Sequence, residues 1–276
     1  MAATVPTLAL NDGRRIPQIG YGCWQLSDEQ APDLVGRALE AGYRLIDTAA
    51  IYGNEAGVGR AVRDTKVPRD EIVLTTKLWN DRQGRDEARR AFDESLHRLD
   101  LPYVDLYLIH WPCPRRRLFV ETWKALIELR AEGRAKSIGV SNFTAEHIAT
   151  LLAETGVAPA VNQIELHPHF QRKAPRVDDA RHGIVTESWS PLGQGKELND
   201  PAVLAIAKAH GKSPAQVVLR WQVQIGCVAI PKTARPERIL ENIALFDFEL
   251  GADEMAQIAA LDRPDGRIGP DPATYC

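Results

Sequence analysis

Hydrophobic residues in this chain follow two patterns, short continuous runs and longer segments in which they recur every three or four positions. Short runs rich in Val, Ile, Leu, Thr and Tyr between turn residues are typical of strands that are buried on both faces. The longer segments, such as the one that carries Phe92, Leu96 and Leu99, have helical spacing. We therefore expect eight strands, at residues 16–22, 43–48, 71–77, 103–110, 135–141, 159–166, 184–190 and 227–232.

The regular alternation of strands and helices predicts the fold class. Strands that alternate with helices pair in parallel through right-handed crossovers, and eight such units close an α/β barrel of the (β/α)8, or TIM, type. Residues 7–17 have a turn-rich centre at Asn11 to Gly13 and predict a β-hairpin before the first unit. No linker or repeat divides the chain, so we expect residues 1–276 to form a single barrel domain.

Capping residues support the predicted helices. Ser213, Pro214 and Gln216 have the pattern of an N-cap, a first-turn proline and a capping-box partner. Residues 171–183 should hold the sixth helix, but they include Pro175 and few apolar positions, so we expect that helix to be short or mobile. Glycines stand where helices should end, at Gly42, Gly133, Gly156, Gly211 and Gly226.

Composition and charge exclude several classes of protein. Apolar residues make up 44% of the chain, charged residues 26%, and the net charge is −3. This balance does not predict a nucleic-acid-binding surface, and the basic run from Arg115 to Arg117 has no interleaved aromatic residues. The amino terminus has no basic region or long apolar stretch, so we expect neither a signal peptide nor a membrane span, and a cytoplasmic location.

The four cysteines, Cys23, Cys113, Cys227 and Cys276, are widely scattered and form no CxxC pair or zinc-ligand spacing. Free thiols in a reducing compartment are the simplest interpretation. Cys23 and Cys113 both follow predicted strand ends, so an approach of these two at the mouth of a barrel is the alternative.

Ionisable residues end three consecutive predicted strands, at Asp47, Lys77 and His110, and Tyr52 follows five positions after the first. A charged group inside a doubly buried strand would be costly. At the carboxyl ends of parallel strands, however, such groups converge where barrel enzymes have their active sites. The alternative is three unrelated polar strand ends, but their recurrence favours a site.

Elements that suit a phosphate occur late in the chain. No GxGxxG follows an early strand and no GxxxxGK occurs, so the two common nucleotide fingerprints are absent. Instead, SPLGQGK after the seventh strand contains Gly193 and Gly195, and PKTARPER after the eighth contains Lys232 and Arg238. Late loops and a helix amino terminus are a usual phosphate site in barrels. A flexible turn and a surface ion-pair helix are the competing interpretations.

Three long motifs carry a resemblance to a known family. GYRLIDTAAIYGNEAGVG at residues 42–59, KSIGVSNF at residues 136–143 and IPKTARPERILENIAL at residues 230–245 resemble the three signatures of the aldo-keto reductase family, in the same order. NDRQ, ELHP and ESWSPLGQGK are most similar to bacterial members of the 2,5-diketo-D-gluconate reductase type.

The resemblance implies a catalytic role for each ionisable strand end. Tyr52 would be the general acid, Lys77 and Asp47 the pair that tunes it, and His110 the residue that orients a carbonyl group. A nearby ammonium lowers the pKa of a phenol by favouring phenolate, and a carboxylate keeps a buried ammonium charged. The family reaction is reduction of a carbonyl by hydride from NADPH, with the phenol protonating the developing alkoxide.

The resemblance also implies the cofactor contacts. Ser141, Asn142 and Gln163 would meet the nicotinamide carboxamide, and Trp189, where many members have Tyr, would stack on the ring. The loop that follows would line the pyrophosphate with Ser190, Leu192, Gly193, Gln194 and Gly195. Lys232, Thr233 and Arg238 resemble a clamp on the 2′-phosphate of NADP, with Glu241 and Asn242 near the adenine.

Substrate contacts are predicted at three tryptophans, Trp24, Trp79 and Trp111, each of which follows a strand end. A single Trp more often belongs to a core, but three beside a proposed site favour a pocket. The Pro- and Gly-rich tail at residues 263–276 would complete its wall. His167 and His169 form an HxH pair, but no convincing further ligands accompany them, so we expect no metal.

These observations predict a monomeric NADPH-dependent reductase of small aldehydes, ketones or diketo sugar acids, with no nucleic-acid or membrane partner. The alternative is a barrel that binds NADP but serves as a regulatory or structural partner, because fold alone does not fix function. The presence of Asp47, Tyr52, Lys77 and His110 together favours the enzyme.

Overall fold

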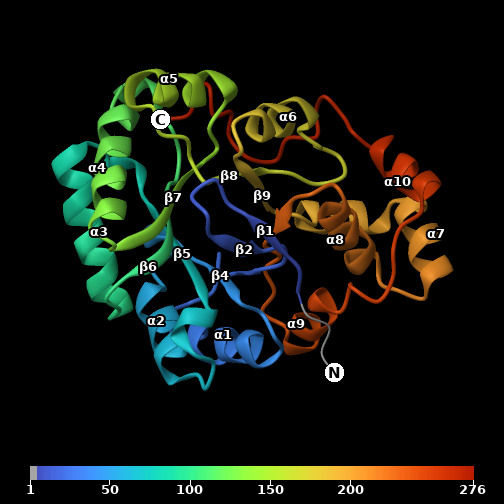
Figure 1. Ribbon diagram of the computed structural model, residues 1–276. Coiled ribbons are helices and arrows are strands. Elements are labelled where there is room, and N and C mark those ends of the chain that lie inside the picture. Colours follow the sequence, from blue (N-terminus) through green and yellow to red (C-terminus); the bar gives the residue numbers. More distant parts are fainter. Residues whose placement is uncertain (1–4) are drawn as a thin grey trace.

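Eight parallel strands form the centre of the molecule and helices surround them (Figure 1), in a computed structural model that describes residues 5–276. The strands follow one another around the barrel in chain order, from β3 to β10. A parallel bridge between Ile19 and Ala229 brings the last strand to the segment before the first, and the Gly20 amide donates to the Ala229 carbonyl at 2.8 Å. This closure confirms the predicted (β/α)8 barrel.

The elements have the following bounds. The strands are β1 Thr7–Ala9, β2 Arg15–Pro17, β3 Tyr21–Gly22, β4 Leu45–Asp47, β5 Val73–Leu78, β6 Val104–Ile109, β7 Ala135–Ser141, β8 Val161–Glu165, β9 Val185–Trp189 and β10 Val228–Ala229. The helices are α1 Ala31–Glu40, α2 Glu55–Asp64, α3 Arg85–Leu99, α4 Phe119–Ala131, α5 Ala145–Thr155, α6 Lys173–Arg181, α7 Pro201–His210, α8 Pro214–Gln224, α9 Pro236–Ile243 and α10 Ala252–Ala259.

The predicted hairpin is present as β1 and β2, in which Leu8 pairs with Ile16. It corrects one expectation, because residues 16–22 do not form one barrel strand. Ile16 pairs within the hairpin and is buried there, whereas only Tyr21 and Gly22 pair with β4. Because the hairpin takes up the backbone hydrogen bonds of residues 15–17, the first barrel strand is left short.

Helix ends agree with the predicted capping. The Ser213 hydroxyl accepts from the Gln216 amide, and the Gln216 side chain accepts in turn from the Ser213 amide, so α8 begins with a full capping box. The five glycines predicted at helix ends all have positive φ angles. The sixth helix, α6, is short, with nine residues. Asp179 is its one buried residue, because the sequence gives this helix little apolar surface to dock.

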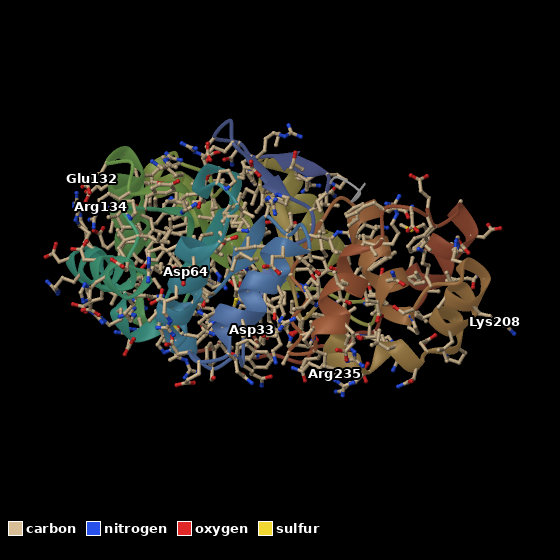
Figure 2. The ribbon with its side chains drawn as sticks, turned by 90° about the horizontal axis from the view of Figure 1, so that it is seen from below. Asp33, Asp64, Glu132, Arg134, Lys208 and Arg235 are labelled. Carbon is tan, nitrogen blue, oxygen red and sulfur yellow. A yellow bond between two sulfur atoms is a disulfide. The ribbon has the colours of Figure 1, made fainter. Side chains whose placement is uncertain are left out.

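Buried apolar side chains fill the barrel and the layer between strands and helices. Phe92 and Trp123 belong to the outer layer, and Trp221 belongs to a separate cluster under α7, α8 and α10. Inside the barrel, Leu45, Leu106 and other aliphatic residues pack above the hairpin. Charged side chains stand on the outer helices and on the turns at their ends. Figure 2 labels Asp33, Asp64 and Lys208 on helices, and Glu132, Arg134 and Arg235 in the turns beside them. Within residues 5–276, no helix combines the length and the apolar character needed to cross a membrane.

Strand register sets the site. Asp47 is the last residue of β4 and pairs with Thr75, while Lys77 lies two residues further along β5. Gln163 of β8 lies beside Glu187 of β9. Because all of these strands are parallel, their carboxyl ends open at the same mouth of the barrel.

Candidate active site

A cavity of about 580 Å³ lies at the carboxyl ends of the strands. Polar side chains from seven of the strands or the loops that follow them reach it, and aromatic residues form much of its wall. Its lining consists of Gly22, Trp24, Gln25, Asp47, Ile51, Tyr52, Trp79, His110, Trp111, Asn142, Gln163, Trp189, Ser190, Pro191, Gln194, Ile230, Lys232, Ile268, Gly269, Pro270 and Tyr275. A concave, mostly apolar site with a few convergent polar groups is typical of small-molecule binding.

Asp47 and Lys77 form a buried ion pair beneath this cavity. The Lys77 Nζ atom lies 2.6 Å from Asp47 Oδ1 and also donates to the Thr48 carbonyl at 2.9 Å. Burial alone would lower the pKa of Lys77, but the charge and the hydrogen bond of Asp47 hold it above its ordinary value. Lys77 is therefore an ammonium at neutral pH, as the sequence predicts.

Tyr52 lies above the ion pair, at the end of a short 3-10 turn at Ala50–Tyr52. Its ring centroid is 5.2 Å from Lys77 Nζ and 5.8 Å from the His110 ring. Burial raises the pKa of the Tyr52 phenol above its ordinary value, and the positive charge of Lys77 lowers it only in part. The expected effect of Lys77 is present, but burial outweighs it.

His110 follows β6 and faces the same cavity. Burial is the main cause that holds the pKa of His110 well below its usual range, and the charge of Lys77 is the second. The imidazole is therefore neutral at pH 7. The Asn142 amide donates to the His110 carbonyl at 3.0 Å and fixes the backbone there. The His110 Nδ1 atom is buried and has no hydrogen-bond partner among the residues that the structure describes. A neutral imidazole can offer one N–H to a carbonyl oxygen without competing as an acid.

The four residues predicted around a nicotinamide lie together at the ends of β7, β8 and β9. Ser141 Oγ donates to the Gln163 carbonyl at 2.8 Å, and Asn142 Nδ2 donates to Ser141 Oγ at 3.0 Å. The Trp189 indole donates to Asn142 Oδ1 at 2.8 Å. Gln163 lines the cavity, and its Oε1 atom makes no hydrogen bond to residues 5–276. It is a free acceptor facing a small-molecule site.

The loop after β9 adopts a run of left-handed conformations, at Ser190, Gly193, Gln194 and Gly195. Ser190 and Gln194 line the cavity, whereas Leu192, Gly193 and Gly195 lie behind them. A side chain at Gly193 would collide with the Glu197 carboxylate, while the space at Gly195 is open. The two glycines thus have different roles: one lets the loop fold over Glu197, and the other leaves the backbone approachable.

The loop after β10 carries the predicted phosphate-binding cations. Lys232 lines the cavity, and Arg238 is exposed in the first turn of α9. Neither forms an ion pair within the described part of the chain, whereas other arginines do, such as Arg37 with Asp33 and Arg220 with Glu249. Thr233 is buried, and its hydroxyl accepts from the Arg235 amide at 3.1 Å. Glu241 and Asn242 lie further along α9.

The three tryptophans predicted to contact substrate all line the cavity. Trp24 stands at its rim with 44% of its surface exposed, and Trp111 is buried. The Trp79 ring packs edge-on against His110, with centroids 5.1 Å apart. Trp79 therefore lies close to the atoms that would contact a carbonyl group.

Trp79→Ala is expected to change the ranking of substrates more than it changes NADPH binding. Removing the indole widens the cavity. The ratio of kcat/KM for bulky substrates to that for small ones should therefore rise roughly tenfold, the effect of one to two hydrophobic contacts. The measurement is kcat/KM for a series of aldehydes of increasing size, with NADPH affinity determined by calorimetry. Trp24→Ala, at the exposed rim, is the matched control. An equal loss for every substrate together with a lowered melting temperature would instead identify Trp79 as a core residue.

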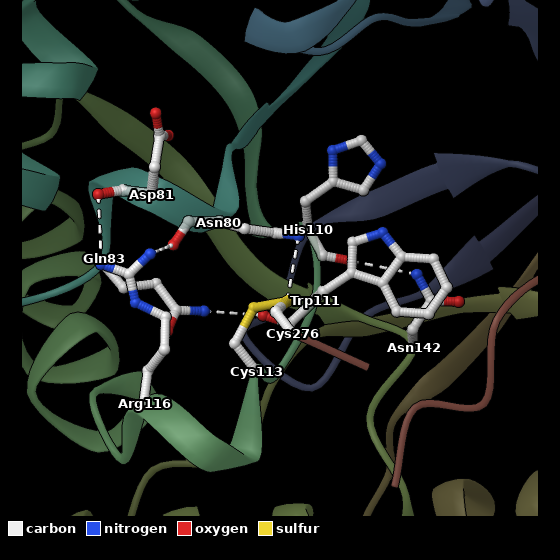
Figure 3. Close-up of a disulfide and its surroundings, with 9 residues drawn as sticks. All are labelled: Asn80, Asp81, Gln83, His110, Trp111, Cys113, Arg116, Asn142 and Cys276. Atoms are coloured by element: carbon white, nitrogen blue, oxygen red, sulfur yellow. Dashed lines mark hydrogen bonds between the residues drawn. A yellow bond between two sulfur atoms is a disulfide. The ribbon is translucent and has the colours of Figure 1, made fainter. Parts of the chain in front are cut away.

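A disulfide between Cys113 and Cys276 corrects the expectation of four free thiols (Figure 3). Cys23 and Cys227 are free and buried, so the approach of Cys23 to Cys113 that was considered above is not found. The C-terminal segment, red in Figure 1, runs from α10 across the barrel mouth and brings Cys276 to the loop after β6. Because 163 positions separate the two cysteines, their spacing gives no signal of this contact.

The disulfide lies beside the cavity. Tyr275, next to Cys276, packs edge-on against Trp111 with ring centroids 4.7 Å apart, and Asn80 Nδ2 lies 3.1 Å from Cys276 Sγ. Further back along the tail, the Glu165 carboxylate accepts from the amides of Ile268 and Gly269 at 2.5 and 2.8 Å. The tail is thus held at two points, and Ile268, Gly269, Pro270 and Tyr275 line the cavity, as expected of a tail that forms part of its wall. Glu165 was not identified from the sequence. Its only signal is a carboxylate at a buried strand end.

Cys276→Ser is expected to raise the KM for substrate about two- to tenfold, because it releases the Tyr275–Trp111 ring contact. NADPH affinity should not change. Dithiothreitol should have the same effect on the wild-type enzyme, by reducing the disulfide to two thiols, and no further effect on the variant. A thiol titration of the denatured protein checks the premise: two thiols without reductant and four after reduction. Four thiols without reductant would contradict it.

His167 and His169 contact carboxylates. His167 Nε2 lies 3.0 Å from Glu165 Oε1, and its Nδ1 lies 2.6 Å from Glu197 Oε1. Burial lowers the pKa of His167, but the two carboxylates outweigh it and raise the net value. His169 Nε2 contacts the Arg263 guanidinium at 3.0 Å. His167 thus connects the tail anchor Glu165 to Glu197 beneath the loop after β9, and His169 contacts the start of the tail at Arg263.

Comparisons with known proteins agree with this geometry. A sequence model described as the aldo/keto reductase family matches residues 18–263. An aldo-keto reductase of Mycolicibacterium smegmatis is 53% identical over 98% of both chains. A protein named methylglyoxal reductase DkgA from Escherichia coli is 50% identical over 99% of both chains. A crystal structure of a Gox0644 mutant in complex with NADPH superposes with a TM-score of 0.96 at 49% identity, covering 99% of this chain and 100% of that one.

Proposed function

The chain belongs to the aldo/keto reductase family, and we propose that it uses NADPH to reduce small polar aldehydes and ketones to alcohols. One observation carries the proposal: Tyr52 and His110 face one cavity directly above the buried Asp47–Lys77 ion pair. A proton donor, a neutral hydrogen-bond donor and a fixed positive charge are what a developing alkoxide requires.

Each residue has a distinct task in this reaction. His110, kept neutral by burial, offers a hydrogen bond that orients the carbonyl oxygen. Tyr52 donates its phenolic proton to that oxygen as negative charge develops, and Lys77 stabilises the phenolate that remains. Asp47 keeps Lys77 charged within the barrel. NADPH, when bound, supplies the hydride.

The described residues fit such a cofactor at both of its ends. At the barrel centre, Gln163 Oε1 is an acceptor without a partner in residues 5–276 and suits the N–H groups of a carboxamide. At the rim, Lys232 and Arg238 lack carboxylate partners in the same residues and suit a phosphate dianion. The Trp189 side chain, also in the cavity wall, suits a flat ring.

The wall of the cavity indicates the substrate class. Aromatic side chains surround a small polar floor, which favours short molecules that place a carbonyl group at the floor and a compact remainder against the wall. Because a relative is named methylglyoxal reductase, 2-oxoaldehydes are the first candidates, and diketo sugar acids are the second. We propose a monomer, since the cavity is lined within one chain.

A steady-state assay tests the proposal. The purified chain is mixed with NADPH and a panel containing methylglyoxal, simple aldehydes, ketones and 2,5-diketo-D-gluconate, and loss of NADPH absorbance is followed. Turnover with identification of the alcohol product is expected. NADPH binding without turnover on any member would favour the alternative, a barrel that binds cofactor and acts through a partner.

A further inference from the structure

A second buried carboxyl group, Glu187, lies beside the proposed catalytic residues and has no role in the reaction described above. It is the third residue of β9, pairs in register with Gln163 of β8, and is fully buried. Its Oε2 atom accepts from Gln163 Nε2 at 3.2 Å, and its Oε1 atom is buried without a partner in the described residues. A carboxyl group in this position calls for an explanation, because burying it is costly.

Gln163 connects Glu187 to the active site. An amide nitrogen carries two hydrogens, and Gln163 Nε2 donates one to Asp47 Oδ2 at 2.8 Å and the other to Glu187 Oε2. With both hydrogens used, the amide cannot rotate by half a turn without breaking two contacts. Its oxygen therefore faces the cavity, which is the orientation that accepts from a carboxamide.

The charges in the barrel decide the protonation state of Glu187. The charged groups that face it are Asp47 of β4 and Lys77 of β5, while neighbouring β8 and β10 present the neutral Gln163 and Val228. Lys77 contacts Asp47 and the Thr48 carbonyl, so its single positive charge is already matched. A second carboxylate would be buried without a cation. Burial, followed by the charge of Asp47, accordingly raises the pKa of Glu187 to about 8.

We propose that Glu187 is a positioning residue of this reductase: as a neutral acid, it accepts the second hydrogen of the Gln163 amide, aims that amide at the cofactor and leaves Asp47 as the only negative charge beside Lys77. The inference rests on the proposed function. Ionisation of Glu187 would place a second negative charge in the cluster, which disfavours the Tyr52 phenolate and so makes Tyr52 a weaker proton donor. Activity should therefore fall as Glu187 loses its proton.

The first test detects the proton without any activity. In the cofactor-free protein at pH 7, infrared difference spectra should show the C=O stretch of a buried carboxylic acid, lost as the pH rises past about 8 and absent in Glu187→Gln. Asp179 is the matched control, because it is buried, accepts from Asn162 and Thr186, and lies outside the cavity. Burial raises its pKa only to about 6, so Asp179→Asn should keep the band. Absence of the band in the wild type overturns the proposal.

The second test is the pH profile of kcat, from about pH 6 to about pH 10. The wild type should lose activity above about pH 8, and Glu187→Gln, which cannot ionise, should keep it to a higher pH. The direction of the shift in Glu187→Gln separates two explanations of the alkaline loss of activity. If this loss came from Tyr52 alone, removing a negative neighbour would lower the Tyr52 pKa and move the loss to lower pH. Asp179→Asn should leave the pH of the loss in place. A loss at unchanged or lower pH in Glu187→Gln overturns the proposal.

The third test separates this role from the reaction itself. Glu187→Leu removes one of the two acceptors that hold the Gln163 amide and leaves only Asp47 Oδ2. The amide is then held less firmly, and the Kd for NADPH should rise about three- to tenfold, the effect of one hydrogen bond. Glu187→Gln should restore most of the affinity, because its carbonyl still accepts. If the wild type reduces no carbonyl compound, the proposed function fails. The dissociation constants for NADPH then still test, without any activity, whether Glu187 positions Gln163. Equal affinities in all three proteins overturn the positioning role.

Discussion

Tyr52→Phe is expected to lower the turnover number for ketone reduction by roughly two to four orders of magnitude, the usual contribution of a positioned general acid. Burial raises the pKa of Tyr52, so the phenol keeps its proton throughout the neutral range and is available to donate it. Phenylalanine retains the ring that packs against His110 and Lys77 but has no proton to give. Turnover is measured at saturating NADPH with a ketone from the panel.

Two comparisons make this result specific. NADPH affinity should change little, because the proposed role of the hydroxyl is towards the carbonyl group and Tyr52 is not among the predicted cofactor contacts. Tyr103→Phe serves as the control, since Tyr103 lies under the Arg69 guanidinium and the Lys136 ammonium, away from the cavity. A Tyr52→Phe enzyme that reduces the ketone at near wild-type rate would remove Tyr52 from the acid role.

Lys232→Gly combined with Arg238→His is expected to weaken NADPH binding by one or more orders of magnitude while leaving NADH binding nearly constant. A charge-assisted contact to a phosphate is worth about 1.5 to 3 kcal/mol, and neither cation has a competing carboxylate in residues 5–276. NADH lacks the phosphate, so the wild type should prefer NADPH clearly. Dissociation constants for both coenzymes are obtained by quenching of Trp fluorescence.

Salt and a neighbouring arginine provide the controls for coenzyme preference. Because Arg238 is exposed, the wild-type preference for NADPH should fall as the salt concentration rises. Arg235→His removes a charge from the same loop without touching the predicted clamp and should have a much smaller effect. Equal affinity of the wild type for NADH and NADPH would refute the assignment of this loop.

Local chemistry explains why much of the fold and the site was predictable from the sequence. Strand runs that end in Asp47, Lys77 and His110 can only be buried if their polar ends open at one mouth, and the barrel places them there. Capping residues such as Ser213 and Gly156 act within a few positions, so their helices begin and end as expected. The three long motifs added the cofactor positions, which no periodicity would have identified.

The features that were missed depend on contacts between distant segments. The Cys113–Cys276 bond and the hold of Glu165 on the tail depend on the exact path of the C-terminal segment over the barrel mouth. This segment was expected at the pocket wall, but nothing in its sequence fixes the two contacts. The net pKa of Tyr52 depends on how much of the barrel surrounds the phenol, so Lys77 alone was a poor guide. In the sequence, Glu187 is only a polar residue within a predicted strand. Its position becomes informative once the fold places Gln163 between it and Asp47.

The bond between Cys113 and Cys276 also makes a covalent ring of the chain from the loop after β6 to the last residue. A cross-link that spans 163 positions restricts the unfolded chain more than a local one does. In the loop-entropy description it contributes about 5 kcal/mol, against about 3 kcal/mol for a loop of about 15 residues. The ring includes β7 to β10, which present most of the predicted cofactor contacts. In the oxidised protein, these strands can separate from the barrel only as a closed loop, so the cofactor half of the molecule gains resistance to unfolding that the hairpin and the first four barrel strands, β3 to β6, do not share.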